Sequence, residues 1–140
     1  MENKSKLTVS IFSFSYKKGI PEDDSENGGG FVFDGRGILN PGRIQEYKTQ
    51  TGRDLEVKNY LETQTQMPQF LESVFKVVEI SLDDYLARNF ENLQISFGCT
   101  GGQHRSVYCA DALANHIQKK YPNITIQLCR REPEAKNWIN

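Results

Sequence analysis

The residues best suited to chemistry lie in one run, Gly98-Cys99-Thr100-Gly101-Gly102-Gln103-His104-Arg105-Ser106. Apolar and polar residues alternate over 93–97, which predicts a strand, and apolar residues recur at helical spacing from Arg105 onward. The first N–H groups of a helix have no partner inside the helix and lie at the positive end of its dipole. Gly101 and Gly102 let the turn approach a ligand closely, and His104 and Arg105 add donors. The run therefore predicts an oxyanion site, first of all for a phosphoryl group.

The elements that must position this run are expected in the order strand, strand, helix, strand, helix, strand. The apolar pattern predicts strands over 7–16, 31–34, 93–97 and 124–130, helices over 68–86 and 105–121, and a short helix over 55–62 that Asp54 caps. Residues 43–54 look irregular. This order is typical of an α/β domain, three-layer α/β/α, with a mostly parallel sheet of about four strands. The length of 140 residues suits a single domain over 1–140.

Charged residues follow the first two strands and are expected to join the loop. Ligands of parallel sheets bind outside the carboxyl ends of the strands. If the first three strands run parallel, the predicted ligand site also includes Lys17, Lys18, Asp34 and Arg36. Structural alternatives stay open for these residues, because the lysines can form a solvated turn and Arg36 can pair with Asp34. In the loop, Cys99 can equally be a small apolar residue that closes the strand, and His104 can merely cap the helix.

Composition narrows the class of protein. The formal net charge is −1, so no global basic field indicates a nucleic-acid partner. The apolar runs are too short to cross a bilayer, and the N-terminus lacks the apolar core of a signal peptide. The three cysteines form no CxxC pair, and no metal-ligand spacing is present. The sequence therefore predicts a cytoplasmic protein that uses no metal or cofactor.

Several motifs along the chain occur together in one known family. They are Ser13-Phe14-Ser15-Tyr16-Lys17-Lys18-Gly19-Ile20-Pro21, Phe33-Asp34-Gly35-Arg36, Asn40-Pro41, Thr51-Gly52-Arg53-Asp54 and the long run over 98–108. On these motifs the chain resembles the C-terminal domain of the RapZ family of nucleotide-binding proteins, over about residues 10–130. The resemblance implies an α/β fold and a regulator more than an enzyme. It also implies anion binding at the positions that match the family's motif, Lys17, Asp34, Arg36, Cys99, Gly101, Gly102, His104 and Arg105.

The resemblance implies partners as well. It points to a phosphorylated small molecule, such as the amino-sugar phosphate glucosamine-6-phosphate, to structured RNA and to self-association. Two departures bear on this. The chain has no GxxxxGK[ST] sequence, so ATP or GTP binding does not carry over, and residues 132–140 hold one lysine where RNA-binding members have a basic tail. Together with the net charge, the depleted tail predicts weak RNA binding by a monomer.

A competing enzyme hypothesis comes from the spacing of Cys99 and Arg105. The two residues satisfy C-x5-R and Ser106 follows, which is similar to the loop of cysteine-dependent phosphatases. In such an enzyme the thiolate attacks phosphorus, and the arginine and the loop N–H groups bind the phosphoryl oxygens. Asp34 is then the candidate general acid. The shorter motif is far less specific than the family match, so we expect a sensor and keep the phosphatase as the alternative.

Overall fold

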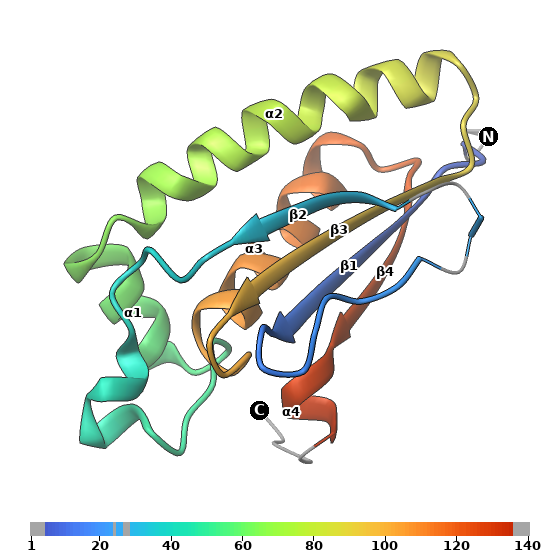
Figure 1. Ribbon diagram of the computed structural model, residues 1–140. Helices are drawn as coiled ribbons and strands as arrows, with labels where there is room; N and C mark the ends of the chain where they lie inside the picture. Colours follow the sequence, from blue (N-terminus) through green and yellow to red (C-terminus); the bar gives the residue numbers. More distant parts are fainter. Residues whose placement is uncertain (1–4, 24, 27–28, 136–140) are drawn as a thin grey trace.

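A parallel four-stranded sheet forms the centre of the domain. The computed structural model describes residues 5–23, 25–26 and 29–135 (Figure 1). Its strands are β1 (Thr8–Ser15), β2 (Gly30–Asp34), β3 (Asn92–Cys99) and β4 (Thr125–Arg130), in the spatial order β2-β3-β1-β4. Every neighbouring pair is parallel, and the register sets Ser15 beside Cys99 and Asp34 beside Gly98. The carboxyl ends of β1, β2 and β3 therefore meet at one edge, as the sequence predicts.

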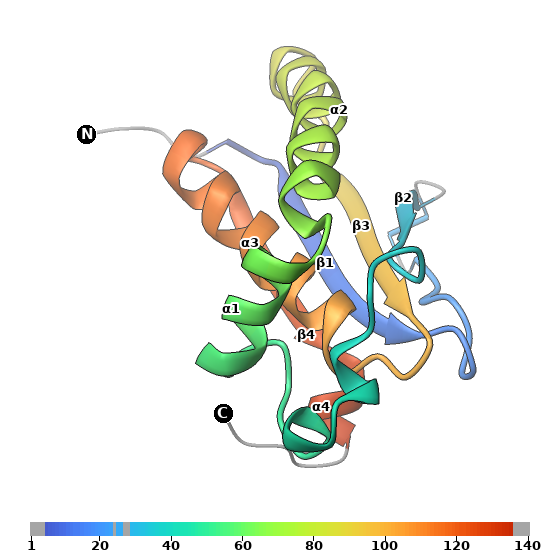
Figure 2. The same ribbon diagram turned by 90° about the vertical axis from the view of Figure 1, so that its left-hand side faces the viewer.

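Three helices cover one face of this sheet (Figure 2). They are α1 (Leu55–Gln64), α2 (Met67–Ala87) and α3 (Arg105–Lys120). None of the described helices has the length and apolar content that a membrane span needs. The core lies between these helices and the sheet, and its most buried side chains include Val9, Ile11, Val57, Leu61, Val78, Leu82, Ile95, Leu113 and Ile117. The periodic apolar stripe of α2 is thus core, and the long helices begin within a residue of where the pattern predicts.

The opposite face of the sheet carries much less helix. The connections from β2 to β3 and from β3 to β4 move in the same direction across the sheet, so right-handed crossovers place both on one face. The connection from β1 to β2 returns across the other face, and its described residues contain no helix. Gln94 Nε2 donates to the carbonyl of Pro21 at 3.1 Å and holds this segment down. The α/β class and the parallel four-stranded sheet are confirmed, and one further short helix among the described residues, α4 (Arg131–Ala135), follows β4.

The segment predicted to be irregular contains two short 3-10 helices, η1 (Pro41–Arg43) and η2 (Gln45–Tyr47). The side chain of Asn40 accepts from the N–H of Gly42 at 2.9 Å and starts η1. Asp54 stands at the N-cap position of α1 as predicted, but its carboxylate accepts from the N–H of Thr51 at 2.7 Å and makes no cap hydrogen bond. This segment lies between the end of β2 and α1, next to the start of α3 (Figures 1 and 2).

Candidate anion-binding site

The ends of three strands are tied together where the loop 100–104 begins. Ser15 Oγ donates to the carbonyl of Thr100 at 2.6 Å. The N–H of Tyr16 donates to the carbonyl of Cys99 at 3.0 Å, and the N–H of Gly35 donates to that of Gly98 at 2.7 Å. These bonds place the residues that follow β1 and β2 beside the loop that follows β3. Topology thus brings the sequence-predicted site residues to one edge, although they are far apart along the chain.

The two loop glycines have different roles. Gly102 has φ +70°, and a Cβ added there would lie 2.6 Å from Glu132 Cγ and 2.9 Å from the backbone nitrogen of Ser15. The loop must therefore have glycine at position 102 to turn back against β1 and α4. Gly101 is exposed, and a Cβ there would meet nothing within 4 Å. Gly101 is consequently the open part of the loop, and Gly102 is its buried anchor.

The start of α3 offers a row of unused donors. Within the described part of the chain, no acceptor meets the backbone N–H groups of residues 100–107. The first N–H of the helix that has an acceptor is that of Tyr108, which donates to the carbonyl of His104 at 3.0 Å. The helix dipole adds partial positive charge at the same place. This arrangement suits an anion placed over the exposed Thr100 and Gly101.

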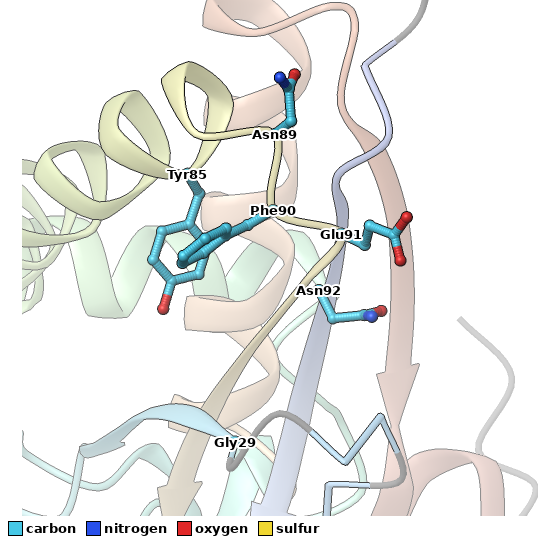
Figure 3. A pocket seen from close by; sticks show the side chains of 6 residues that line it. All are labelled: Gly29, Tyr85, Asn89, Phe90, Glu91 and Asn92. Carbon is cyan, nitrogen blue, oxygen red and sulfur yellow. The ribbon is translucent and has the colours of Figure 1, made fainter.

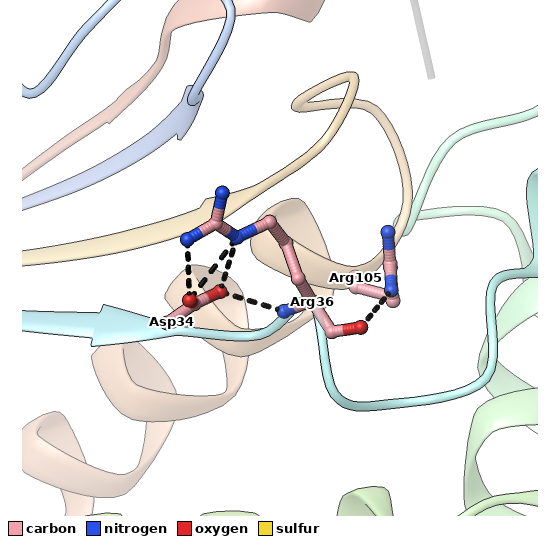
Figure 4. A network of polar contacts seen from close by, with 3 residues as sticks. All are labelled: Asp34, Arg36 and Arg105. Carbon is pink, nitrogen blue, oxygen red and sulfur yellow. Dashed lines mark hydrogen bonds and ion pairs between the residues drawn. The ribbon is translucent and has the colours of Figure 1, made fainter.

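Arg105 is buried beneath the segment that follows β2, with only 4% of its surface exposed. Its Nη1 donates to the carbonyl oxygen of Arg36 at 2.9 Å, drawn in Figure 4, and to that of Ile38 at 2.7 Å. Its Nε is buried and has no hydrogen-bond partner among the described residues. Two of the five N–H donors of the guanidinium are therefore used to hold the backbone. The positive charge stays at the helix start, in surroundings where charges act more strongly than in water.

Gln103 and His104 fasten the loop to residues 47–52. Gln103 Nε2 donates to the carbonyls of Lys48 at 2.8 Å and Gln50 at 2.6 Å. The ring of His104 is buried, and its Nε2 donates to the carbonyl of Tyr47 at 2.7 Å. Burial lowers the pKa of His104, so the ring is neutral at neutral pH. The structure therefore gives both side chains a positioning role. His104 stands at the N-cap position of α3, as the capping alternative has it, but its side chain makes no cap hydrogen bond.

Cys99 and Ser106 are buried together on the helix side of the loop. The thiol of Cys99 donates to Ser106 Oγ at 3.2 Å. The exposed fraction is 2% for Cys99 and 0% for Ser106. The apolar alternative for Cys99 agrees with this burial, and the hydrogen bond to a hydroxyl agrees with the phosphatase alternative.

Asp34 and Arg36 form an ion pair at the end of β2 (Figure 4). Arg36 Nη2 lies 2.7 Å from Asp34 Oδ2, and Arg36 Nε donates to Oδ1 at 2.9 Å. The hydrogen bonds from Arg36 lower the pKa of Asp34, so the carboxylate is ionised at neutral pH. The structural-bridge alternative is thus correct for this pair. The guanidinium also stacks on Tyr16, with Cζ 3.8 Å from the ring centroid.

The two lysines after β1 are both exposed. Lys18 Nζ lies 3.5 Å from Glu132 Oε1 on α4. Lys17 has no carboxylate partner among the described residues, and its N–H donates to Ser15 Oγ at 3.2 Å. They stand at the predicted edge of the sheet, and neither lines a hollow next to the loop.

Two hollows flank the loop and share Asn40 and Arg105. The smaller, about 190 Å³, is lined by Asn40, Gly42, Lys48, Cys99, Gly101, Gln103, His104 and Arg105. The larger, about 430 Å³, is lined by Arg36, Gly37, Ile38, Leu39, Asn40, Arg43, Ile44, Tyr60, Thr100 and Arg105. Arg43 and Lys48 have no ion-pair partner within the described ranges. Sequence analysis did not include Arg43 or Lys48 in the site. The segment that holds them has no apolar periodicity, so the sequence gives no sign of where their side chains lie.

A separate hollow of about 340 Å³ lies at the amino end of β3, beside the end of α2 (Figure 3). Tyr85 and Phe90 meet there edge to face, with ring centroids 4.8 Å apart. The side chains of Asn89, Glu91 and Asn92 point in different directions and do not converge (Figure 3). This hollow is therefore not part of the candidate site. Elsewhere in the described residues, no three metal-binding side chains come together.

Comparison with known proteins identifies the family of this chain. The family model described as the RapZ C-terminal domain matches residues 7–134. Similar relatives are each named a nucleotide-binding protein: one from Endomicrobium trichonymphae is 40% identical over 84% of this chain, one from Fervidobacterium nodosum 35% over 91%, and one from Xylella fastidiosa (strain M12) 36% over 86%. The matched part is 39%, 44% and 40% of the length of these relatives, so the chain spans about two-fifths of them. On the match over residues 7–134, the chain belongs to the RapZ C-terminal domain family.

Proposed function

We propose that this domain is a cytoplasmic regulatory sensor that binds a phosphorylated small molecule at the loop 100–104 and the first turn of α3. The observation that carries the proposal is the set of N–H groups over 100–107 that no acceptor among the described residues meets. Arg105 supplies a buried positive charge there, and Lys48 lines the hollow beside Gly101. A phosphate has the charge and the acceptor oxygens that such donors need.

The regulatory role and the choice of glucosamine-6-phosphate rest on the family resemblance alone. The two hollows beside the loop have no carboxylate among their lining residues. An amino group on the ligand would therefore find no obvious counter-ion in either hollow. The structure therefore supports binding of the phosphate group of the ligand, and it does not indicate which sugar carries that group.

Sensing is favoured over hydrolysis by the state of Asp34. A general acid must hold a proton at the working pH, whereas Arg36 keeps Asp34 ionised. Arg105 is also partly committed to two carbonyls. The hydrogen bond between Cys99 and Ser106 is the one observation that favours the phosphatase.

Cys99→Ser separates these two functions. Serine keeps a small hydrogen-bonding side chain beside Ser106 and removes the strong nucleophile. For a sensor, calorimetric titration with inorganic phosphate should give affinities for wild type and Cys99→Ser within about threefold of each other. Neither protein should hydrolyse p-nitrophenyl phosphate.

The matched control is Cys129→Ser, because Cys129 is half-buried on β4, away from the loop. Hydrolysis by wild type and Cys129→Ser that disappears in Cys99→Ser would make the protein a cysteine-dependent phosphatase. Failure of wild type to bind phosphate, sulfate or glucosamine-6-phosphate at millimolar concentration would overturn the proposed sensor.

Weak RNA binding by the monomer remains our second expectation. Several of the chain's basic residues are already paired with carboxylates, among them Arg36 with Asp34, Arg130 with Asp111 and Lys120 with Glu79. Lys119 and Lys120 end α3, at the far end of that helix from the loop. The predicted tail residues 136–140, Lys136 included, lie outside the described residues. The accessible positive charge is thus small and divided between the two ends of the domain.

A fluorescence titration with structured RNA tests this expectation. A size-defined monomer should bind more weakly than about 1 µM at about 150 mM salt, because few phosphates are neutralised together. Tighter binding is expected only from a self-associated form, in which the basic patches of several copies contact the same RNA. Nanomolar binding by a proven monomer at that salt concentration would contradict the prediction.

A further inference from the structure

The two hollows that flank the loop 100–104 hold more positive charge than one phosphate neutralises. Arg105 lines both of them, Lys48 lines the smaller one and Arg43 lines the larger one. No carboxylate is present in either lining, and burial lowers the pKa of His104, so that its ring is neutral. A phosphate monoester carries about 1.5 to 2 negative charges at pH 7. The three cations therefore keep about one uncompensated positive charge when such a group binds.

The uncompensated charge of the larger hollow is that of Arg43, not that of Arg36. The guanidinium of Arg36 is paired with Asp34, with Nη2 at 2.7 Å from Oδ2, and Figure 4 shows it turned over Asp34 and away from Arg105. Arg43 is exposed, and its side chain has no ion-pair partner among the described residues. An anion that enters the larger hollow can therefore bind Arg43 without displacing a carboxylate of the protein.

The larger hollow connects the anion-binding loop with Arg43. Its lining includes Thr100 and Arg105 at the loop and Arg43 on η1, and its volume is about 430 Å³. Within the described residues Arg105 donates to carbonyls through Nη1, and its buried Nε has no acceptor there. Much of the remaining lining is apolar, from Ile38, Leu39 and Ile44. One small molecule with a short carbon skeleton can therefore contact the loop and Arg43 together.

We propose that the ligand of this site is a phosphorylated carboxylic acid, whose phosphate binds at the loop 100–104 and whose carboxylate binds Arg43. The planar donor fork of an arginine matches the two oxygens of a carboxylate. The two anionic groups together carry about three negative charges, which balances Arg43, Lys48 and Arg105. The amino group of an amino-sugar phosphate would instead bring a further positive charge into this cationic site. The proposal rests on the proposed phosphate site and adds the second charged group of its ligand.

The test compares 3-phosphoglycerate, glycerol 3-phosphate and inorganic phosphate by calorimetry on the whole 140-residue chain, at constant pH and ionic strength. The two organic probes, both used as racemates, share a three-carbon skeleton and differ in a carboxylate that replaces one CH2OH group. Wild type should bind 3-phosphoglycerate about tenfold more tightly than glycerol 3-phosphate, because only the former pairs with Arg43. Arg43→Gln should bring the two affinities to within about threefold of each other. It should leave the affinity for glycerol 3-phosphate and the melting temperature close to wild type.

The matched control is Lys119→Gln, which removes one exposed positive charge at the far end of α3 from the loop. Lys119 likewise has no ion-pair partner among the described residues, and this variant should keep the tenfold preference for 3-phosphoglycerate. A preference that survives Arg43→Gln, or that disappears equally in both variants, would overturn the assignment of Arg43.

Two further outcomes separate this proposal from the proposed function. Equal affinities of wild type for 3-phosphoglycerate and glycerol 3-phosphate would overturn the second anionic group and leave the phosphate site standing. Absence of binding by all three probes at millimolar concentration would overturn the phosphate site itself, and the present proposal with it.

Discussion

Replacing Gly52 with alanine should destabilise the domain by about 3 kcal/mol and release residues 47–52 from the start of α3. A Cβ at this position would lie 2.2 Å from the carbonyl oxygen of His104 and 2.5 Å from the backbone nitrogen of Tyr108. Both atoms belong to the first turn of α3 and cannot rotate away as a flexible side chain would. Gly52 also donates its N–H to the carbonyl of Gln103 at 3.0 Å, so the clash opens the contact that positions the loop.

Urea unfolding followed by circular dichroism measures this loss. Gly101→Ala is the matched control, since a Cβ at Gly101 meets nothing within 4 Å. Its stability should stay within about 0.5 kcal/mol of wild type. Equal stability of Gly52→Ala and Gly101→Ala would show that residues 47–52 do not pack against α3 as described.

Replacing Arg105 with methionine should remove both stability and phosphate affinity. Methionine keeps a long apolar chain, but it leaves the carbonyls of Arg36 and Ile38 without the Nη1 donor. Two buried acceptors without partners cost about 2–4 kcal/mol together. Loss of the buried charge beside the loop should lower phosphate affinity by at least about tenfold. The combined effect should exceed that of any surface arginine.

The comparison for this variant is Arg88→Met, which removes an exposed arginine paired with Asp84. An exposed ion pair contributes no more than about 1 kcal/mol, and this one lies away from the loop. Thermal unfolding and phosphate calorimetry on both variants give the result. If Arg105→Met instead had the same melting temperature as Arg88→Met and the same phosphate affinity as wild type, Arg105 would neither stabilise the loop nor contribute charge to the site.

Local sequence patterns were sufficient for the strands and for the start of α3. Alternation over 93–97 and the helical spacing from Arg105 depend on neighbours within a few residues, and β3 and α3 follow them. The meeting of the residues after β1 and β2 with the loop after β3 at one edge also followed, because parallel strands leave the sheet on the same side. These parts of the site could be predicted without coordinates.

Contacts between distant segments could not be predicted in this way. Arg105 bonds to carbonyls 67 and 69 positions earlier, and Gln103 to carbonyls 53 and 55 positions earlier. A residue type indicates that a donor is present but not which backbone it holds. For the same reason the hollow between residues 36–44 and the loop, with Arg43 in its lining, had no signal in the sequence.

The central claim is that phosphate binds to the N–H groups of residues 100–107, and amide-resolved NMR tests it most directly. A 15N-labelled sample is titrated with inorganic phosphate at constant pH and ionic strength. The amide signals of residues 100–107 should shift together and reach saturation, since these N–H groups have no acceptor in the described part of the protein. The signals of residues 89–92, beside the separate hollow of Figure 3, should stay in place. Saturable shifts at residues 89–92 with none at 100–107 would contradict the account.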